Sequence, residues 1–264
     1  MSSRRFDTAA HAYDRFMGRW SRLFAPAVVE AARIARGDRV LDVAAGTGEA
    51  ALAALAAAPD IRVVAVDLSA PMLGAARIKV AGQRVTMAVM DGQTLACRSD
   101  SFDAALCMLG LMFFPDPMQG ASELCRVMRR GARAAVCVWP RHDRAPFPGI
   151  VLGVLAHHAP DQRAELLSSF SLGDPDHLHA VLRNGGLSRV EITSVVRRVV
   201  FDGFDDFWDP IATGGARASQ ALLGLPTAKR EAVRREVRAL IAPFERDGRL
   251  TIDVETLIAI GVKD

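Results

Sequence analysis

The stretch VLDVAAGTGEA, residues 40–50, is the most informative part of this sequence. An apolar run carries an aspartate, and a loop of small residues then leads into an alanine-rich segment. A loop with almost no side chains lets a ligand approach the main chain, as happens in many nucleotide-binding turns between a strand and a helix. The stretch therefore predicts a strand, a ligand-binding loop and a helix, and it leaves the identity of the ligand open.

The segments on both sides of this stretch repeat the same alternation of strand and helix. The predicted strands are nearly continuous apolar runs, which is typical of a parallel sheet covered by helices on both faces. We therefore expect a doubly wound, Rossmann-like α/β fold whose ligand binds at the carboxyl ends of the strands. The predicted strands are 39–43, 61–67, 84–91, 101–110 and 133–140, and the predicted helices are 49–58, 69–81 and 117–128.

The rest of the chain does not continue the regular alternation of strand and helix. Apolar residues at helical spacing from Tyr13 to Phe24 predict an amphipathic helix, and a second helix is expected from Pro26 to Gly37. Residues 141–186 resemble a helical insertion. A long strand is expected at 187–201, an amphipathic helix at 227–244, and an antiparallel edge strand at 250–263, which would complete a mostly parallel sheet of seven strands.

These patterns divide the chain into four segments. We expect an N-terminal helical lid at 1–36, a ligand-binding core at 37–140, a helical cap at 141–186, and closing strands and helices at 187–264. Half of the 264 residues are hydrophobic, which is enough for a sizeable core.

The composition excludes several classes of protein. The net charge is only +3 and the arginines are scattered, so nucleic-acid binding is not expected. No apolar run reaches the roughly 20 residues of a membrane span, and the first residues lack a signal-peptide core, so we expect a cytoplasmic protein. Four cysteines without a C-x-x-C pair predict reduced thiols and no metal site.

Two further aspartates narrow the choice of ligand. The dehydrogenase fingerprint G-x-G-x-x-G is incomplete, because Ala51 stands where its third glycine would be. Asp67 ends the second strand and can accept both hydroxyls of a ribose, which suits NAD and other adenosyl ligands equally. Asp91 ends the third strand and can accept a hydrogen bond from an adenine amino group. A plain strand–helix turn at Gly46 and Gly48 is the alternative.

The motifs VLDVAAGTGE, VVAVDLSAPML, VMDGQTL and FDAALCMLGLMFFPD resemble, in order and in spacing, those of class I S-adenosylmethionine-dependent methyltransferases. The segment YDRFMGRWSR is similar to a bacterial subgroup akin to the ubiquinone/menaquinone-biosynthesis methyltransferases. The resemblance implies that the glycine-rich loop cradles the methionine part of S-adenosylmethionine, that Asp67 holds the ribose and that Asp91 contacts adenine. The implied cofactor-binding residues are Tyr13, Asp42, Ala44, Ala45, Gly46, Thr47, Gly48, Asp67, Leu68, Met72, Asp91, Gly92, Gln93 and Met108.

The sequence departs from the family pattern at three places. Ala44 replaces the first glycine of the usual loop, and MRRGAR lacks the common Pro-Gly-Gly turn before the fifth strand. Met108 and Leu109 stand where relatives often carry polar residues. Phe113 and Phe114 are expected to pack in the core or in a lid rather than to stack on a substrate.

The expected reaction requires the protein mainly to align the acceptor with the methyl group of the cofactor. A sulfonium methyl group is already electrophilic, so holding an acceptor in line with it supplies much of the rate, and no catalytic base is identifiable. Motifs of nucleobase and protein-arginine methylation are not evident. We therefore expect methyl transfer to a small, apolar or aromatic molecule by a monomer or homodimer. A non-catalytic adenosyl-ligand-binding module and an NAD-type oxidoreductase remain as alternatives.

Overall fold

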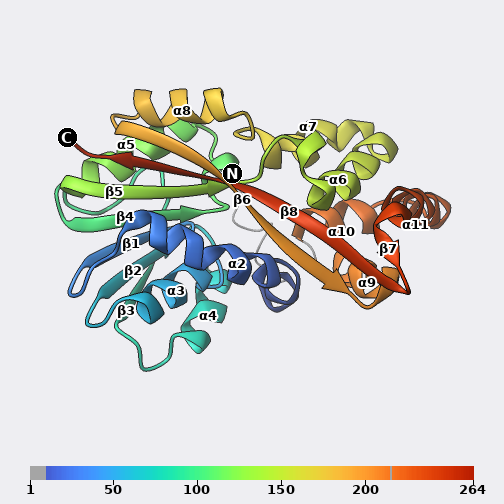
Figure 1. Ribbon diagram of the computed structural model, residues 1–264, viewed down its shortest axis with the longest axis horizontal. Coiled ribbons are helices and arrows are strands. Elements are labelled where there is room, and N and C mark those ends of the chain that lie inside the picture. The colour runs from blue at the N-terminus through green and yellow to red at the C-terminus, as the bar shows by residue number, and fades with distance from the viewer. Residues whose placement is uncertain (1–9, 215) are drawn as a thin grey trace.

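The central feature of the computed structural model, which describes residues 10–214 and 216–264, is a twisted sheet with the strand order β3-β2-β1-β4-β5-β8-β6 (Figure 1). The five strands from β3 to β5 are mutually parallel, which confirms the doubly wound α/β fold. The strands are β1 (Arg39–Val43), β2 (Arg62–Asp67), β3 (Val85–Val89), β4 (Phe102–Met108), β5 (Met128–Val138), β6 (Ser188–Phe201), β7 (Glu245–Arg246) and β8 (Arg249–Val262).

The antiparallel strand β8 does not lie at the edge of the sheet, where the sequence analysis placed it. It pairs with β5 on one side and with β6 on the other, and β6 forms the edge. Residues 254–259 are all buried, whereas exposed residues recur along β6. The longer apolar run therefore takes the inner position, where both faces of the strand are covered.

Helices cover both faces of the sheet (Figure 1). Those that precede β1, β2 and β3 lie on one face, and α5 and α8 lie on the other. The helices are α2 (Ala10–Ala32), α3 (Glu49–Ala57), α4 (Ala70–Lys79), α5 (Pro117–Val127), α6 (Pro146–His158), α7 (Arg163–Leu167), α8 (Pro175–Asn184), α9 (Gly203–Gly214), α10 (Ala216–Leu223) and α11 (Thr227–Ile241). Short 3₁₀ turns are η1 (Leu111–Phe113), η2 (His142–Arg144), η3 (Pro160–Gln162), η4 (Ser168–Phe170) and η5 (Ala242–Phe244).

The N-terminal helix α2 is continuous, so the prediction of two helices divided at Pro26 is wrong. Proline removes one helical hydrogen bond, but the apolar stripe of the helix continues past it. Phe24 before the proline and Val28 after it are both fully buried. Burial of one unbroken face on the sheet outweighs the local cost of the proline.

The passage into β5 also differs from the expectation. The strand begins at Met128, directly after α5, instead of near residue 133. Without a Pro-Gly-Gly turn the chain enters the sheet at once, and the pairing with β4 shifts register between Phe102 and Ala104.

Strands β6 and β8 extend well past the end of β5. Only residues 257–262 of β8 pair with β5, while the rest of β8 pairs with β6 and with short β7. Helices α6, α7, α9, α10 and α11 gather on this projecting ribbon, at the right of Figure 1. We call residues 141–172 and 202–248 the cap. Helix α8, although within the segment 141–186, packs on α5 and β6 instead.

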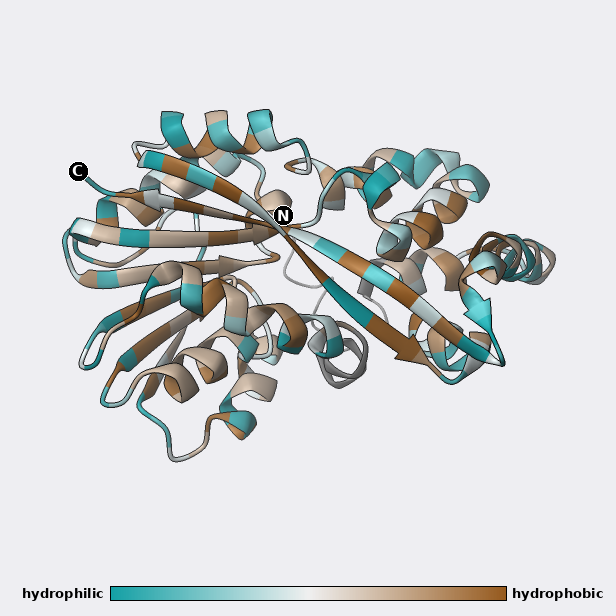
Figure 2. Ribbon diagram, viewed as in Figure 1, coloured by the Kyte–Doolittle hydropathy of each residue, from teal (hydrophilic) through white to brown (hydrophobic). Residues whose placement is uncertain are grey.

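Aromatic side chains join the cap to the core. Trp20 of α2 stacks on Phe147 of α6 with ring centroids 4.2 Å apart, and it also contacts Phe201 at the end of β6. Phe207 of α9 meets both phenylalanines edge-on. Figure 2 shows hydrophobic residues along the strands of the parallel sheet and hydrophilic residues on turns of α8. The N-terminal helix is therefore part of the core as well as a neighbour of the cap.

Candidate cofactor site

The glycine-rich loop between β1 and α3 is built on left-handed backbone. Ala44, Gly46 and Gly48 have φ angles of 56°, 55° and 87°. Only glycine adopts such angles without strain. A side chain at Gly48 would also come within 3.1 Å of the Cβ atom of Ala76 on α4. The two glycines are therefore required by the turn itself and by the close approach of α4.

Asp67, at the end of β2, holds this loop in place. Its carboxylate accepts hydrogen bonds from the Gly46 amide and from the Ser69 amide, each at 2.8 Å. Burial raises the pKa of Asp67, and these amides partly offset that effect. Each oxygen keeps lone pairs for a ligand, so Asp67 links the loop after β1 to the position predicted for a ribose. This structural role was missed in the sequence analysis.

Asp42 lies beneath the loop and is almost fully buried, with 1% of its surface exposed. The Ala51 amide faces this carboxyl and lowers its pKa, but neither carboxylate oxygen has a hydrogen bond of normal geometry. Burial raises the pKa of Asp42 from 3.8 to about 7, and the nearby charge of Asp67 adds to the rise. A buried carboxyl without a partner is unfavourable, so the site is suited to a positively charged or hydrogen-bond-donating group.

The loop after β3 forms the third part of the site. Asp91 accepts hydrogen bonds from the backbone and side-chain nitrogens of Gln93, at 2.8 and 3.2 Å. Gln93 in turn accepts one from the Asp116 amide at 2.8 Å, which ties this loop to the one after β4. A Cβ atom at Gly92 would lie 2.4 Å from the ring of Phe114, so glycine is needed there. Phe114 packs against the loop, as expected from the sequence.

The remaining predicted residues lie on the same edge with different exposure. Leu68 is 40% exposed beside Asp67, whereas Met72 is buried under the N-cap of α4, where its amide donates to the Ser69 hydroxyl. Thr47 is buried within the loop, and Met108 is half-buried at the end of β4. The backbone of Tyr13 belongs to α2, but its side chain is outside the described part of the chain.

Glu49, directly after the loop, is an acidic residue that the sequence analysis did not select. Its side chain is 6% exposed, and Oε1 accepts from Nζ of Lys79 at 2.6 Å and from a guanidinium nitrogen of Arg22 at 3.0 Å. A carboxylate in the first turn of a helix is favoured by the helix dipole. An acidic residue just after a Gly-x-Gly turn is the signal that could have drawn attention to it.

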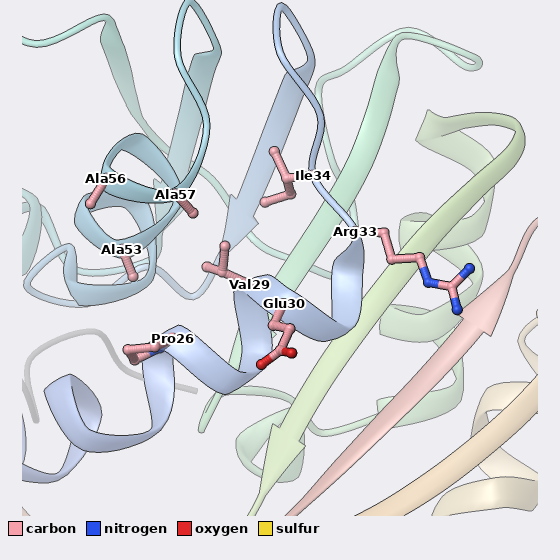
Figure 3. Close-up of a pocket in the computed structure, with 8 residues that line it drawn as sticks. All are labelled: Pro26, Val29, Glu30, Arg33, Ile34, Ala53, Ala56 and Ala57. Atoms are coloured by element: carbon pink, nitrogen blue, oxygen red, sulfur yellow. The ribbon is translucent and has the colours of Figure 1, made fainter.

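A groove of about 460 Å³ lies elsewhere, between the second half of α2 and the end of α3. Figure 3 shows Pro26 and Val29 of α2 on one side, with Ala53, Ala56 and Ala57 of α3 on the other. Both segments lead back to the amino ends of the strands, so the groove is remote from the carboxylates of the site. None of the predicted cofactor-binding residues lines it.

Two negative findings apply to residues 10–214 and 216–264. No group of three histidine, cysteine or acidic side chains there is arranged to hold a metal ion. Within the same ranges, no helix has the length and apolar character needed to cross a bilayer.

Known proteins share both the sequence motifs and this architecture. Residues 40–131 match the family model described as a methyltransferase domain. An uncharacterized protein of Mycobacterium tuberculosis is 33% identical over 162 residues, which are 61% of this chain and 57% of that protein. A demethylmenaquinone methyltransferase of Clavibacter sepedonicus is 39% identical over 137 residues, or 50% of this chain and 55% of that one. The chain thus spans just over half the length of these relatives.

Solved structures share the fold at lower identity. A phosphoethanolamine N-methyltransferase of Haemonchus contortus, in complex with S-adenosyl-L-methionine, has a TM-score of 0.60 at 17% identity and covers all of this chain and 60% of its own. The [4+2]-cyclase SpnF has a TM-score of 0.53 at 19% identity, with 91% and 80% of the two chains covered. The sequence motifs and the fold agree with the family match, in which residues 40–131 correspond to a methyltransferase domain.

Proposed function

We propose that this protein transfers a methyl group from S-adenosylmethionine to a small, apolar or aromatic molecule. One observation carries the proposal: three carboxylates lie at or just beyond the carboxyl ends of three adjacent parallel strands, Asp42 in β1, Asp67 at the end of β2 and Asp91 two residues after β3, and Asp67 holds the glycine-rich loop. When bound, the cofactor supplies an electrophilic methyl group on a sulfonium. The protein's task is to hold that group and to align an acceptor with it.

The charges of the site fit this cofactor better than a dinucleotide. S-adenosylmethionine carries an ammonium, a ribose diol and an adenine amino group, all of which donate hydrogen bonds. Asp42 would face the ammonium, Asp67 the diol and Asp91 the amino group. A pyrophosphate would bring negative charge to a loop beside Asp42 and Asp67, which is electrostatically unfavourable. The buried, unpaired carboxyl of Asp42 is the feature that favours a cationic ligand.

The acceptor side of the proposal rests on apolar surroundings. Met108 ends β4 and Leu109 follows it, and aromatic residues join α2 to the cap. The relative from Clavibacter bears the name of a demethylmenaquinone methyltransferase, which supports an aromatic ring as the acceptor class. The four-segment organisation of lid, core, cap and closing strands belongs to the same proposal.

The fold alone does not fix the reaction, because the cyclase SpnF shares it. Turnover is therefore measured directly, with the full chain, S-adenosylmethionine labelled on its methyl group, and a panel of acceptors. The panel contains a reduced naphthoquinone, a catechol and, as a polar control, phosphoethanolamine. We expect label in the organic extract with an aromatic acceptor and far less with Asp67→Ala. Cofactor binding without label in any acceptor would favour a non-catalytic binding module.

A further inference from the structure

The N-terminal helix α2 contacts the cofactor loop and the cap within four consecutive residues. Arg22 pairs with Glu49, which follows the last glycine of the loop. Arg19 donates to the carbonyl oxygen of Val200 at 2.9 Å, and its guanidinium lies 4.4 Å from the ring centroid of Phe201. Since residues three apart share a face of a helix, both contacts lie on one side of α2.

The attachment on the cofactor side is a buried carboxylate that pairs with two cations. The side chain of Glu49 is 6% exposed, that of Lys79 is 22% exposed and that of Arg22 is 52% exposed. A carboxylate this buried is strongly destabilised when its partners are removed. Because Glu49 is joined covalently to Gly48, and Gly48 packs tightly on Ala76 of α4, a shift of the loop moves the carboxylate that holds Arg22.

On the cap side, α2 is attached by a ring contact and by an ion pair. Trp20 is 1% exposed and stacks on Phe147 of α6, and Arg19 also lies 3.9 Å from the carboxylate of Asp206 on α9. A helix that moves at Arg22 therefore carries Arg19 and Trp20 with it, because a helix is rigid over one turn. Packed interfaces of this kind change arrangement as units rather than deforming gradually.

We propose that Glu49 is a positioning residue that transmits occupancy of the glycine-rich loop to the cap, through Arg22 and α2. Binding of the cofactor would thereby order the cap and prepare the acceptor side of the site. This inference rests on the proposed function, since it takes an adenosyl cofactor as the occupant of the loop. It assigns to Glu49 no contact with the reacting atoms.

The test is hydrogen–deuterium exchange of the full-length protein with and without saturating S-adenosylhomocysteine. In the wild type the ligand should slow exchange in the loop and, at least about fivefold, in α6 and α9, the lower end of typical coupling between two sites. Glu49→Gln and Arg22→Gln should each keep the protection of the loop and lose that of the cap. Titration of each variant establishes the ligand concentration that saturates it.

Two control variants distinguish the proposed role of Glu49 from a general contribution to the stability of the fold. Glu123→Gln removes another carboxylate of similar burial, which pairs with Arg126 at 2.6 Å outside the cap, and Arg36→Gln removes the pair with Asp60 at 2.7 Å. Both should retain the response of the cap to the ligand. If the ligand still protected the cap fully against hydrogen exchange in saturated Glu49→Gln, this inference would be wrong, while the proposed function would be unaffected. A wild type that does not bind the ligand would overturn the proposed function, and this inference with it.

Discussion

The two sides of the carboxyl edge of the sheet differ in the kinds of residue that form them. On the proposed cofactor side, Asp42 is the penultimate residue of β1, Asp67 is the last residue of β2 and Asp91 follows β3 by two residues, and small residues form the loop after β1. On the proposed acceptor side, Phe201 at the end of β6 contacts Trp20 and Phe207, and Phe147 packs against both of these rings. Main-chain geometry thus shapes one side, and side-chain volume shapes the other.

This difference has a consequence for substitution. A ligand held by main-chain amides and carboxylates depends on a few positions with strict requirements, such as a glycine at positive φ. Aromatic packing tolerates exchange of one apolar residue for another of similar volume. We therefore expect single substitutions in the loop or at its carboxylates to weaken cofactor binding. We expect substitutions that repack the cap to change which acceptor is used.

The largest expected effect concerns the cap. Phe207 is 1% exposed and contacts three other phenylalanine rings, so Phe207→Ala should lower the free energy of unfolding by about 3–5 kcal/mol. Affinity for S-adenosylhomocysteine, measured where the variant is fully folded, should fall by no more than about fivefold, the coupling expected between the cap and the loop. Urea unfolding and titration calorimetry measure the two quantities, and Phe207→Leu serves as the milder control. A parallel collapse of affinity in a folded variant would show that the two sides are not separable.

The second effect concerns Asp42 and pH. Its pKa is about 7 in the folded protein and 3.8 in the unfolded chain, so the folded state holds the proton more tightly. Stability from this group is therefore present at low pH and is lost as pH rises from about 4 through 7. Between pH 5 and pH 8 the unliganded wild type should lose about 2–3 kcal/mol more than Asp42→Asn does.

Urea unfolding of both proteins at the two pH values measures this difference. Asp67, whose pKa burial also raises, is present in both and cancels in the comparison. An equal change in wild type and variant would mean that Asp42 is ionised at pH 5 and already has a partner.

The third effect uses two glycines in matched conformations. Gly46 and Gly37 both have positive φ, and a Cβ atom at either would meet no atom within 4 Å. Each glycine-to-alanine change should cost about 1–2 kcal/mol of stability, because the strain is the same. Only Gly46→Ala should weaken binding of S-adenosylhomocysteine, by tenfold or more, since only Gly46 lies in the loop. Equal affinity in the two variants would remove the loop from the binding site.

The same contrast explains what could be predicted from the sequence. The loop at Gly46 and Gly48 and the strand end at Asp67 were located correctly, because each is a local pattern of residues next to an apolar run, whereas the third strand ends at Val89, two residues before Asp91. The aromatic cluster that joins the cap to the core was not located, because Trp20, Phe147 and Phe207 are far apart in the chain and meet only after folding. Glu49 was missed for the same reason, since its partners Arg22 and Lys79 come from two other helices.

Two errors of fold have a common physical cause. Pro26 and the final strand were judged by local rules, a proline as a helix start and an alternating pattern as an edge. In both places the burial of a long apolar face determined the outcome: α2 continues past its proline, and β8 enters the interior of the sheet.

The most direct test of the central claim is titration calorimetry of the full chain with S-adenosylhomocysteine and, separately, with NAD. The claim is that the carboxyl ends of β1, β2 and β3 form an S-adenosylmethionine site. It predicts saturable heat with S-adenosylhomocysteine, weakened by about 1–3 kcal/mol in Asp67→Ala, the usual scale for a hydrogen bond to a charged group, and no heat with NAD. Clear binding of NAD without binding of S-adenosylhomocysteine would contradict it.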